Sequence, residues 1–135
     1  MPSIKTDKYF EAVGRRKTST ARVRIFIAEK PEFSVNGKEA KLYFPTAEMQ
    51  KTIQDPFSKL KLTEKFRVSV KVSGGGLHSQ AEAVRHGLAR VLTLWNAEFR
   101  GKLKKAGFLK RDPRMKERRK FGLKKARKSP KWSKR

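Results

Sequence analysis

The chain has 135 residues, of which 36% are hydrophobic and 36% charged, and its 36 Lys and Arg against 12 Asp and Glu give a formal net charge of +24. This length suits one small domain, the absence of Cys excludes disulfides and thiolate metal sites, and no apolar run reaches the roughly 18 residues that a membrane-spanning helix needs. We therefore expect a soluble protein of the cytoplasm, or of an organelle after removal of a presequence, whose partner is a polyanion such as nucleic acid.

The first motif, GRRKTSTARV at residues 14–23, places three consecutive cations before three hydroxyl residues. Cations neutralise phosphates, and hydroxyl groups hydrogen-bond phosphate or ribose oxygens. An ordinary solvated basic loop is the alternative interpretation. The candidates for RNA contacts in this motif are Arg15, Arg16, Lys17, Thr18 and Ser19.

Two segments alternate between apolar and polar residues with the period of a half-buried strand. In residues 22–28 one face carries Val23, Ile25 and Ile27, and residues 66–72 repeat the pattern with Phe and Val. Both predicted strands leave cations on the opposite, outer face. The expected RNA contacts on that face are Arg22, Arg24 and Lys71.

Two shorter elements are expected between these strands. Residues 33–35 are typical of a strand that ends at an Asn-Gly turn at residues 36–37. Residues 46–54 are typical of a short helix, and Asp55 before Pro56 predicts its end.

The strongest helical pattern follows three glycines at residues 74–76. Apolar residues recur every three or four positions from Leu77 to Trp95, and Phe99 and Leu103 are candidates to extend the same helix. This apolar face must pack on the sheet. The other sides of the helix carry Gln80, Arg85, His86 and Arg90.

The three glycines have two compatible interpretations. They permit positive φ and close backbone approach in a tight passage from strand to helix, and the amides at the helix N-terminus can also receive an RNA phosphate. The motif lacks the Gly-Lys-Ser/Thr ending of a nucleotide-binding P-loop, so nucleotide hydrolysis is not expected. The candidates for RNA contacts in this region are Gly74, Gly75, Gly76, Gln80, Arg85 and Arg90.

These elements predict an α+β fold, a two-layer sandwich in which helices pack on one face of a mixed sheet. The helical region is expected to end at Gly107, because Lys104 and Lys105 suit the negative end of a helix dipole and Gly suits the cap. We therefore predict a globular domain over residues 1–107 and an extended polycationic tail over residues 108–135.

The C-terminal end holds most of the positive charge. Residues 100–135 contain 18 basic and two acidic side chains, so they carry 18 − 2 = +16 of the net +24. The segment from residue 110 has too few apolar side chains for a core, and its 26 residues could reach roughly 85 Å when extended. The cations expected to bind RNA there are Lys110, Arg111, Arg114, Arg118, Arg119, Lys120, Lys124, Lys125, Arg127 and Lys128. Trp132 is expected either to stack on RNA or to contact protein.

No pattern of catalytic residues stands out. The acidic residues are scattered singly, and HExxH, GxSxG and Walker A motifs are absent. We predict no enzyme activity, no metal, no cofactor, no small-molecule substrate and no membrane contact. An RNA-processing enzyme using His78 or His86 is the alternative, and a surface or RNA-contact role for both is the plainer interpretation.

Three segments together resemble one protein family. They are GRRKTSTARV at residues 14–23, GGGLHSQAEAVRHGLAR at residues 74–90, and KAGFLKRDPRMKERRKFGLKKARKSPKWSKR at residues 105–135. With the Asn-Gly turn at residues 36–37 they place nearly the whole chain in register with the universal small-subunit ribosomal protein conventionally numbered nine. The chain departs from common bacterial members at Ser79, where Gly is frequent, and at residues 131–132, where Gln-Phe is frequent.

The resemblance implies a structural protein of the head of the small ribosomal subunit, with the fold of the second domain of ribosomal protein five. Its partners would be the 3′ major domain of a 16S-type ribosomal RNA, neighbouring head proteins, and the tRNA in the peptidyl site. The family's terminal Ser-Lys-Arg lies against the anticodon stem-loop, and in this chain those positions are Ser133, Lys134 and Arg135. A free nucleic-acid-packaging protein or RNA chaperone is the alternative that composition leaves open.

Overall fold

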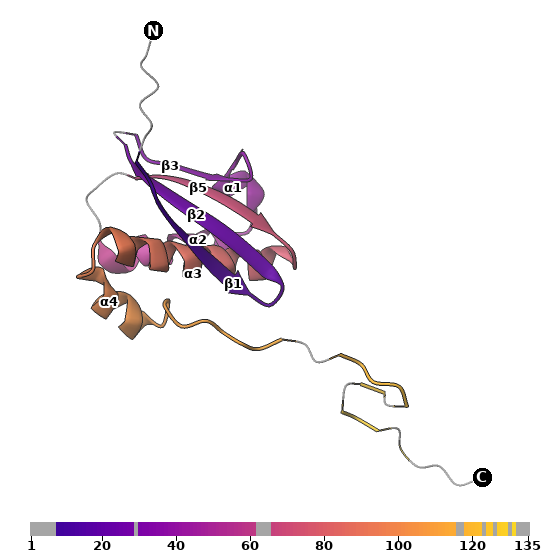
Figure 1. Cartoon of the computed structure of the whole chain (residues 1–135). Coiled ribbons are helices and arrows are strands. Elements are labelled where there is room, and N and C mark those ends of the chain that lie inside the picture. The colour runs from indigo at the N-terminus through magenta and orange to yellow at the C-terminus, as the bar shows by residue number, and fades with distance from the viewer. Residues whose placement is uncertain are drawn as a thin grey trace.

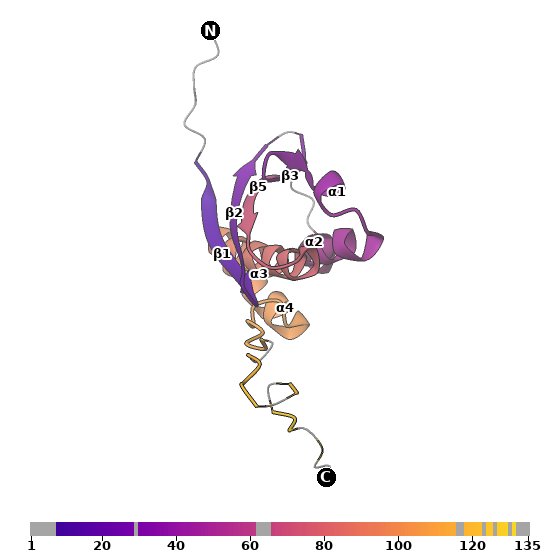
Figure 2. The same cartoon turned by 90° about the vertical axis from the view of Figure 1, so that its right-hand side faces the viewer.

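A computed structural model of the chain describes residues 8–28, 30–61, 66–115, 118–122, 124–125, 127–129 and 131. A five-stranded sheet packs one face against helices, and a C-terminal segment leaves the domain (Figures 1 and 2). The sheet is mixed, since β3 runs parallel to β5 and the other pairs are antiparallel, which confirms the predicted α+β class. The spatial order of the strands is β1-β2-β5-β3-β4. The elements are β1 (Phe10–Arg16), β2 (Ser19–Ile27), β3 (Glu32–Val35), β4 (Lys38–Glu39), α1 (Ala40–Tyr43), α2 (Ala47–Leu60), β5 (Phe66–Ser73), α3 (Leu77–Trp95) and α4 (Phe99–Ala106).

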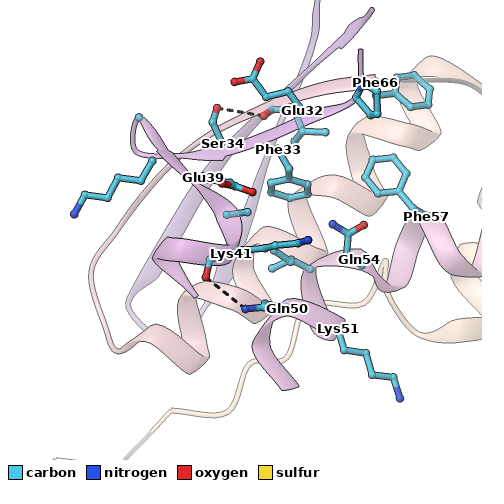
Figure 3. A pocket seen from close by; sticks show the side chains of 16 residues that line it. Glu32, Phe33, Ser34, Glu39, Lys41, Gln50, Lys51, Gln54, Phe57 and Phe66 are labelled. Atoms are coloured by element: carbon cyan, nitrogen blue, oxygen red, sulfur yellow. Dashed lines mark hydrogen bonds between the residues drawn. The ribbon is translucent and has the colours of Figure 1, made fainter. Parts of the chain in front are cut away.

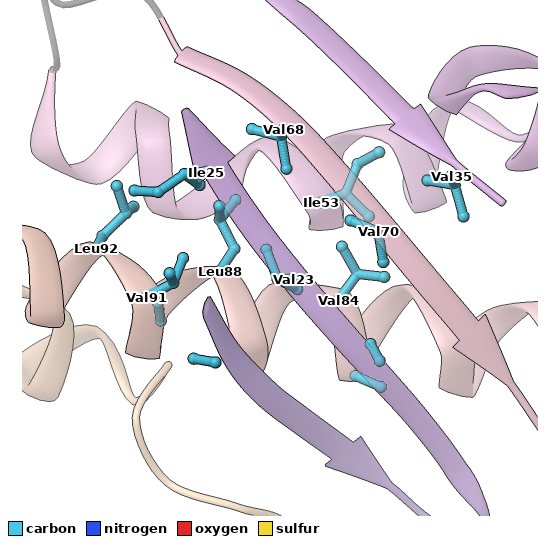
Figure 4. Close-up of a cluster of buried hydrophobic side chains, with 14 of the residues drawn as sticks. Val23, Ile25, Val35, Ile53, Val68, Val70, Val84, Leu88, Val91 and Leu92 are labelled. Atoms are coloured by element: carbon cyan, nitrogen blue, oxygen red, sulfur yellow. The ribbon is translucent and has the colours of Figure 1, made fainter. Parts of the chain in front are cut away.

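The two predicted strands are β2 and β5, which pair with each other through eight residues. Their inward faces are buried, and Val23, Val68 and Val70 lie with Leu88 of α3 in the core (Figure 4). One position departs from the alternation. Ile27 ends β2 and stays 69% exposed, so its predicted place on the buried face was wrong.

Strand β1 was not predicted. It forms a hairpin with β2 through the turn at Lys17 and Thr18, so the GRRKTS motif is a strand end and a turn rather than a loop before the first strand. Only Ala12 and Gly14 of β1 face inward and are buried. Neither of these small residues gives the alternation by which a strand is detected in a sequence.

The absence of a side chain at Gly14 lets β1 lie directly on α3. A Cβ on Gly14 would come within 1.9 Å of the Ala83 carbonyl oxygen and 2.3 Å of the Gly87 amide nitrogen. A Cβ on Gly87 would meet Val23 Cγ2 at 2.8 Å and Gly14 N at 3.0 Å. The two glycines therefore form a strand-helix crossing that larger residues would separate.

The Asn-Gly turn is confirmed. Asn36 and Gly37 have φ of 51° and 79° and join β3 to β4, as two-residue hairpin turns require. The Asn36 side chain also binds β5, donating to the Val72 carbonyl at 2.9 Å and accepting from the Val72 amide at 2.9 Å. The turn thus fixes β3 and β4 against the sheet.

Helix α2 continues past the residues predicted to end it. It starts after Thr46, whose hydroxyl accepts from the Met49 amide at 3.3 Å, and runs through Pro56. Proline interrupts the backbone hydrogen-bond ladder. Here Ile53, Pro56 and Leu60 are buried at helical spacing, and this packing on the core outweighs the lost bond.

The helical region after the glycines is divided in two. Helix α3 ends at Trp95, and Phe99 and Leu103 belong to the separate helix α4, which packs Leu103 into the core. The predicted cap is confirmed, because Gly107 has φ of 80° and its amide closes the last turn of α4.

Candidate nucleic-acid interface

The outer face of the sheet carries the predicted cations, partly neutralised by one carboxylate. Glu11 of β1 pairs with Arg22 Nε at 2.9 Å and with Arg24 Nε at 3.3 Å. Lys71 lies directly opposite Arg22 and is exposed. Like charges opposite each other destabilise a sheet, so an anion bound between them would relieve this repulsion.

Aromatic rings extend this face, although the sequence analysis named only its cations as contacts. Tyr9 and Phe26 have ring centroids 5.5 Å apart, Arg24 lies 4.7 Å from the centre of Tyr9, and Arg67 lies 4.4 Å from the centre of Phe26. The contacts are cation-π interactions. The alternation of Arg24 and Phe26 on β2 was visible in the sequence, but their partners outside β2 required the register of the sheet.

The hairpin tip separates the residues of the GRRKTS motif. Arg15 and Lys17 are exposed, and Lys17 holds a left-handed φ of 53°. Ser19, in contrast, is 1% exposed, and its hydroxyl bonds the Gly74 carbonyl and the Ser79 hydroxyl, each at 2.8 Å. The Ser19 hydroxyl therefore links the hairpin to the glycine loop inside the protein.

The glycine loop has a structural reason for its composition. Gly74 and Gly75 have φ of 79° and 62°, and a Cβ on Gly74 would lie 2.5 Å from the Thr18 carbonyl oxygen. Gln80, predicted to face outward, is buried. Its side-chain Nε2 donates to the Gly74 carbonyl at 3.0 Å, and its Oε1 accepts from the Tyr43 hydroxyl at 2.7 Å.

The N-terminus of α3 is open to an anion. Gly76 caps the helix without a side-chain hydrogen bond. The backbone amide of Gln80 donates to the Gly76 carbonyl at 3.0 Å and closes the first turn of the helix. The preceding amides of Leu77, His78 and Ser79 have no acceptor within the helix. Residues 74–78 are exposed, so these amides lie beside an accessible loop.

Arg16 holds the beginning of the tail against the domain. Its guanidinium pairs with Glu82 of α3 at 2.6 Å and with Asp112 at 3.4 Å, and it donates to the Arg114 carbonyl at 2.9 Å. The Arg16 side chain is only 13% exposed. Its charge therefore connects β1, α3 and the chain after Gly107.

Asp112 and Arg114 close a small loop in the same place. Arg114 Nη2 donates to Asp112 Oδ2 at 2.7 Å, and the Arg114 amide donates to Asp112 Oδ1 at 2.9 Å. These bonds to Arg114 hold the pKa of the Asp112 carboxyl well below its usual range, and the same pair raises the pKa of Arg114.

His86 makes a second link between the domain and the tail. Its Nδ1 accepts from the Arg15 amide at 3.3 Å, and its Nε2 lies 3.3 Å from the Leu109 carbonyl. A neutral ring with the proton on Nε2 satisfies both contacts. Burial lowers the pKa of His86, and the nearby charges of Arg90 and Arg111 lower it further against the opposing bond to Leu109.

The remaining predicted cations of α3 are also engaged. Arg85 lies 5.2 Å from the ring centre of Phe108 and 3.8 Å from Asp55, and Arg90, which is exposed, donates to the Val13 carbonyl. We call residues 107–114, with their contacts to Arg16, His86 and Arg85, the tail root.

Beyond the tail root the described chain runs away from the domain (Figure 1). The predicted tail cations that the structure describes are exposed: Lys110, Arg111, Arg114, Arg118, Arg119, Lys120, Lys124, Lys125, Arg127 and Lys128. Phe121 is fully exposed as well. Trp132, Ser133, Lys134 and Arg135 lie outside the described residues.

Neither a metal site nor a membrane-spanning helix competes with this basic surface in the part of the chain that is described. Its His, Asp and Glu residues form no group of three that could hold a metal ion. None of its helices is both long enough and apolar enough to cross a membrane. His78 lies 3.8 Å from Glu48, and both side chains are largely exposed.

Comparisons with known proteins agree with the motifs. The family model described as ribosomal protein S9/S16 matches residues 14–135. A small ribosomal subunit protein uS9 from Desulfovibrio desulfuricans is 48% identical over 130 residues, which cover 96% of this chain and 99% of that protein.

Proposed function

Because this chain belongs to the ribosomal protein S9/S16 family, whose members are structural and non-enzymatic proteins of the small ribosomal subunit, we propose a division of roles between its domain and its tail. The domain docks on the 3′ major domain of the 16S-type ribosomal RNA in the head, beside neighbouring head proteins of a cytoplasmic ribosome. The tail passes between RNA helices and ends at the anticodon stem-loop of the tRNA in the peptidyl site.

The proposal rests on the contrast between two parts of the tail. The tail root is anchored to the domain, and the chain after it is a polycation. Residues 115–135 contain 11 basic side chains and one acidic side chain, a net charge of 11 − 1 = +10. Residues before them are held to β1 and α3 by ion pairs and hydrogen bonds. A tail attached in this way starts in a defined direction and takes the rest of its shape from the phosphates that neutralise it.

The RNA contacts of the domain lie on the outer sheet face, the hairpin tip, the glycine loop and α3. The residues that we propose to contact RNA there are Arg15, Lys17, Thr18, Arg22, Arg24, Lys71, Gly74, Gly75, Gly76, Arg85 and Arg90. Arg16, Ser19 and Gln80 shape the same surfaces from inside, since their polar groups bond protein atoms. The shape of these surfaces supplies the specificity that tail cations lack.

Electrostatic binding makes a quantitative expectation for the free protein. With six to ten phosphate contacts, its affinity for the ribosomal RNA fragment should fall roughly 10³- to 10⁵-fold between 50 and 200 mM salt. In cell lysate the protein should sediment with small subunits. Sedimentation with free RNA or DNA instead would favour the packaging or chaperone alternative.

The proposed tRNA contact is tested by deleting Ser133, Lys134 and Arg135. Subunits carrying the deletion should assemble normally and bind tRNA more weakly in the peptidyl site, measured by filter binding. The matched control replaces Lys124 and Lys125 by Ala, which likewise removes two positive charges and keeps the terminus. The control should spare tRNA binding, and equal tRNA affinity in subunits with the unchanged protein, the deletion and the control would refute the contact.

A further inference from the structure

One continuous part of the fold carries no net charge. From the first residue of β3 to the last of α2, residues 32–60 contain four Lys and four acidic residues, so their net charge is 4 − 4 = 0. The other residues therefore hold the whole +24. A nucleic-acid surface needs an excess of cations, and this part of the molecule has none.

The same segment borders a hollow with a volume of about 900 Å³. Phe33 projects from β3 and Phe57 from α2 into this hollow, with Phe66 of β5 beside them (Figure 3). Phe33 and Phe57 are only partly buried. The hollow has the size and the apolar lining that suit a bound apolar side chain or ligand.

An open strand edge lies beside the hollow. β4 pairs only with Ser34 and Val35 of β3, so no described strand covers the outer edge of β3 at Glu32 and Phe33. Unpaired backbone groups at a sheet edge are a template for an added strand. Gln54, Lys41 and Glu39 surround the hollow with polar groups of both signs.

We propose that this hollow is a docking site for an extended segment of a neighbouring protein, which pairs with the edge of β3 at Glu32 and Phe33 and places an apolar side chain between Phe33 and Phe57. A neutral surface with a polar rim and an apolar centre is the composition of a protein-protein interface. The inference rests on the proposed place of the domain in the subunit. It assigns the basic sheet face to RNA and the β3-α2 face to protein.

The chain contains no Cys, so an introduced thiol is the only thiol of this protein that a maleimide can label. Gln54→Cys places the thiol on an exposed position of α2 at the hollow, and Thr20→Cys places it on the exposed outer face of β2. Each variant is expressed in cells, the small subunits are purified, and a maleimide photo-crosslinker is attached and activated. Adducts are then identified by mass spectrometry.

The thiol of the Gln54→Cys variant should give adducts with a protein of the subunit, and the thiol of the Thr20→Cys variant should give adducts with ribosomal RNA. The inference is overturned if the label at position 54 reacts with RNA or with nothing. If the thiol at position 54 is protected from the label, the crosslinker is attached at the rim position Lys41→Cys instead, and absence of a protein adduct from that position overturns the inference. If Gln54→Cys disturbs folding, Lys41→Cys on another part of the rim provides the same measurement. Absence of all variants from the subunits would count against the proposed function rather than against the docking site.

Discussion

The crossing of β1 over α3 makes Gly14→Ala the sharpest test of this fold. The added Cβ would lie 1.9 Å from the Ala83 carbonyl oxygen, whereas ordinary contacts begin at 3.4 Å, so β1 must move away by about 3.4 − 1.9 = 1.5 Å. Both clashing groups are backbone atoms of a buried helix and cannot turn aside. Overpacking of a core costs about 1–3 kcal/mol, and we expect the upper end, about 3 kcal/mol.

For a domain of this size such a loss lowers Tm by roughly 12–24 °C, which urea and thermal unfolding followed by circular dichroism will detect. Gly101→Ala is the matched control, because nothing lies within 4 Å of its added Cβ and Gly101 is inside α4. That change should stabilise the protein by about 0.5–1 kcal/mol. A Gly14→Ala protein within about 0.5 kcal/mol of the unchanged protein, a difference usual for surface substitutions, would refute the close crossing.

Two further predictions concern the tail root. Because burial lowers the pKa of His86 from 6.5, the imidazole binds a proton more readily in the unfolded chain than in the folded one. The stability that the neutral ring contributes is therefore present above about pH 6.5 and is lost as the pH falls below it. His86→Gln should show a smaller loss of unfolding free energy between about pH 7.5 and 5.5, and an unchanged loss would contradict the burial of the neutral ring. Asp112→Asn removes the charge that faces Arg16 and Arg114 and should speed amide exchange at residues 108–114 without changing the unfolding of the domain. Glu11→Gln, which removes the pairs with Arg22 and Arg24 on the sheet, is its control, and equal exchange in the two variants would contradict the role of Asp112.

The sequence was informative where side chains were large or turns were specific. β2 and β5 could be predicted because Val and Ile alternate with cations, and the Asn36 turn and the Gly107 cap because few residues adopt positive φ. β1 could not be predicted, because its buried positions hold Ala12 and Gly14. These residues pack well at the crossing because they are small, and small residues give no apolar alternation in the sequence. The continuation of α2 through Pro56 depended on burial that no local pattern reports.

The sequence predicted which cations belong to the candidate interface, but not which of them are exposed and which are paired inside the protein. Arg15 and Arg16 are neighbours in the sequence, yet Arg15 is exposed, whereas the Arg16 side chain is 13% exposed in an ion pair with Glu82. Strand alternation separates them once β1 is known. The tail root itself depends on contacts between residues about a hundred positions apart, such as Arg16 with Asp112 and Arg114, and only the folded structure brings them together.

Strand β1 connects the proposed RNA surfaces to the tail. It supplies Glu11 to the outer sheet face, Arg15 to the hairpin tip and Arg16 to the tail root. Ordering the backbone of one residue costs roughly 1–2 kcal/mol, so the residues fixed at positions 108–114 during folding need not be ordered again when RNA binds. Residues 115–135 carry a net charge of +10, and their attraction to phosphates offsets the remaining cost of assembly. A protein with a loosened root should therefore bind RNA more weakly even with every tail cation intact.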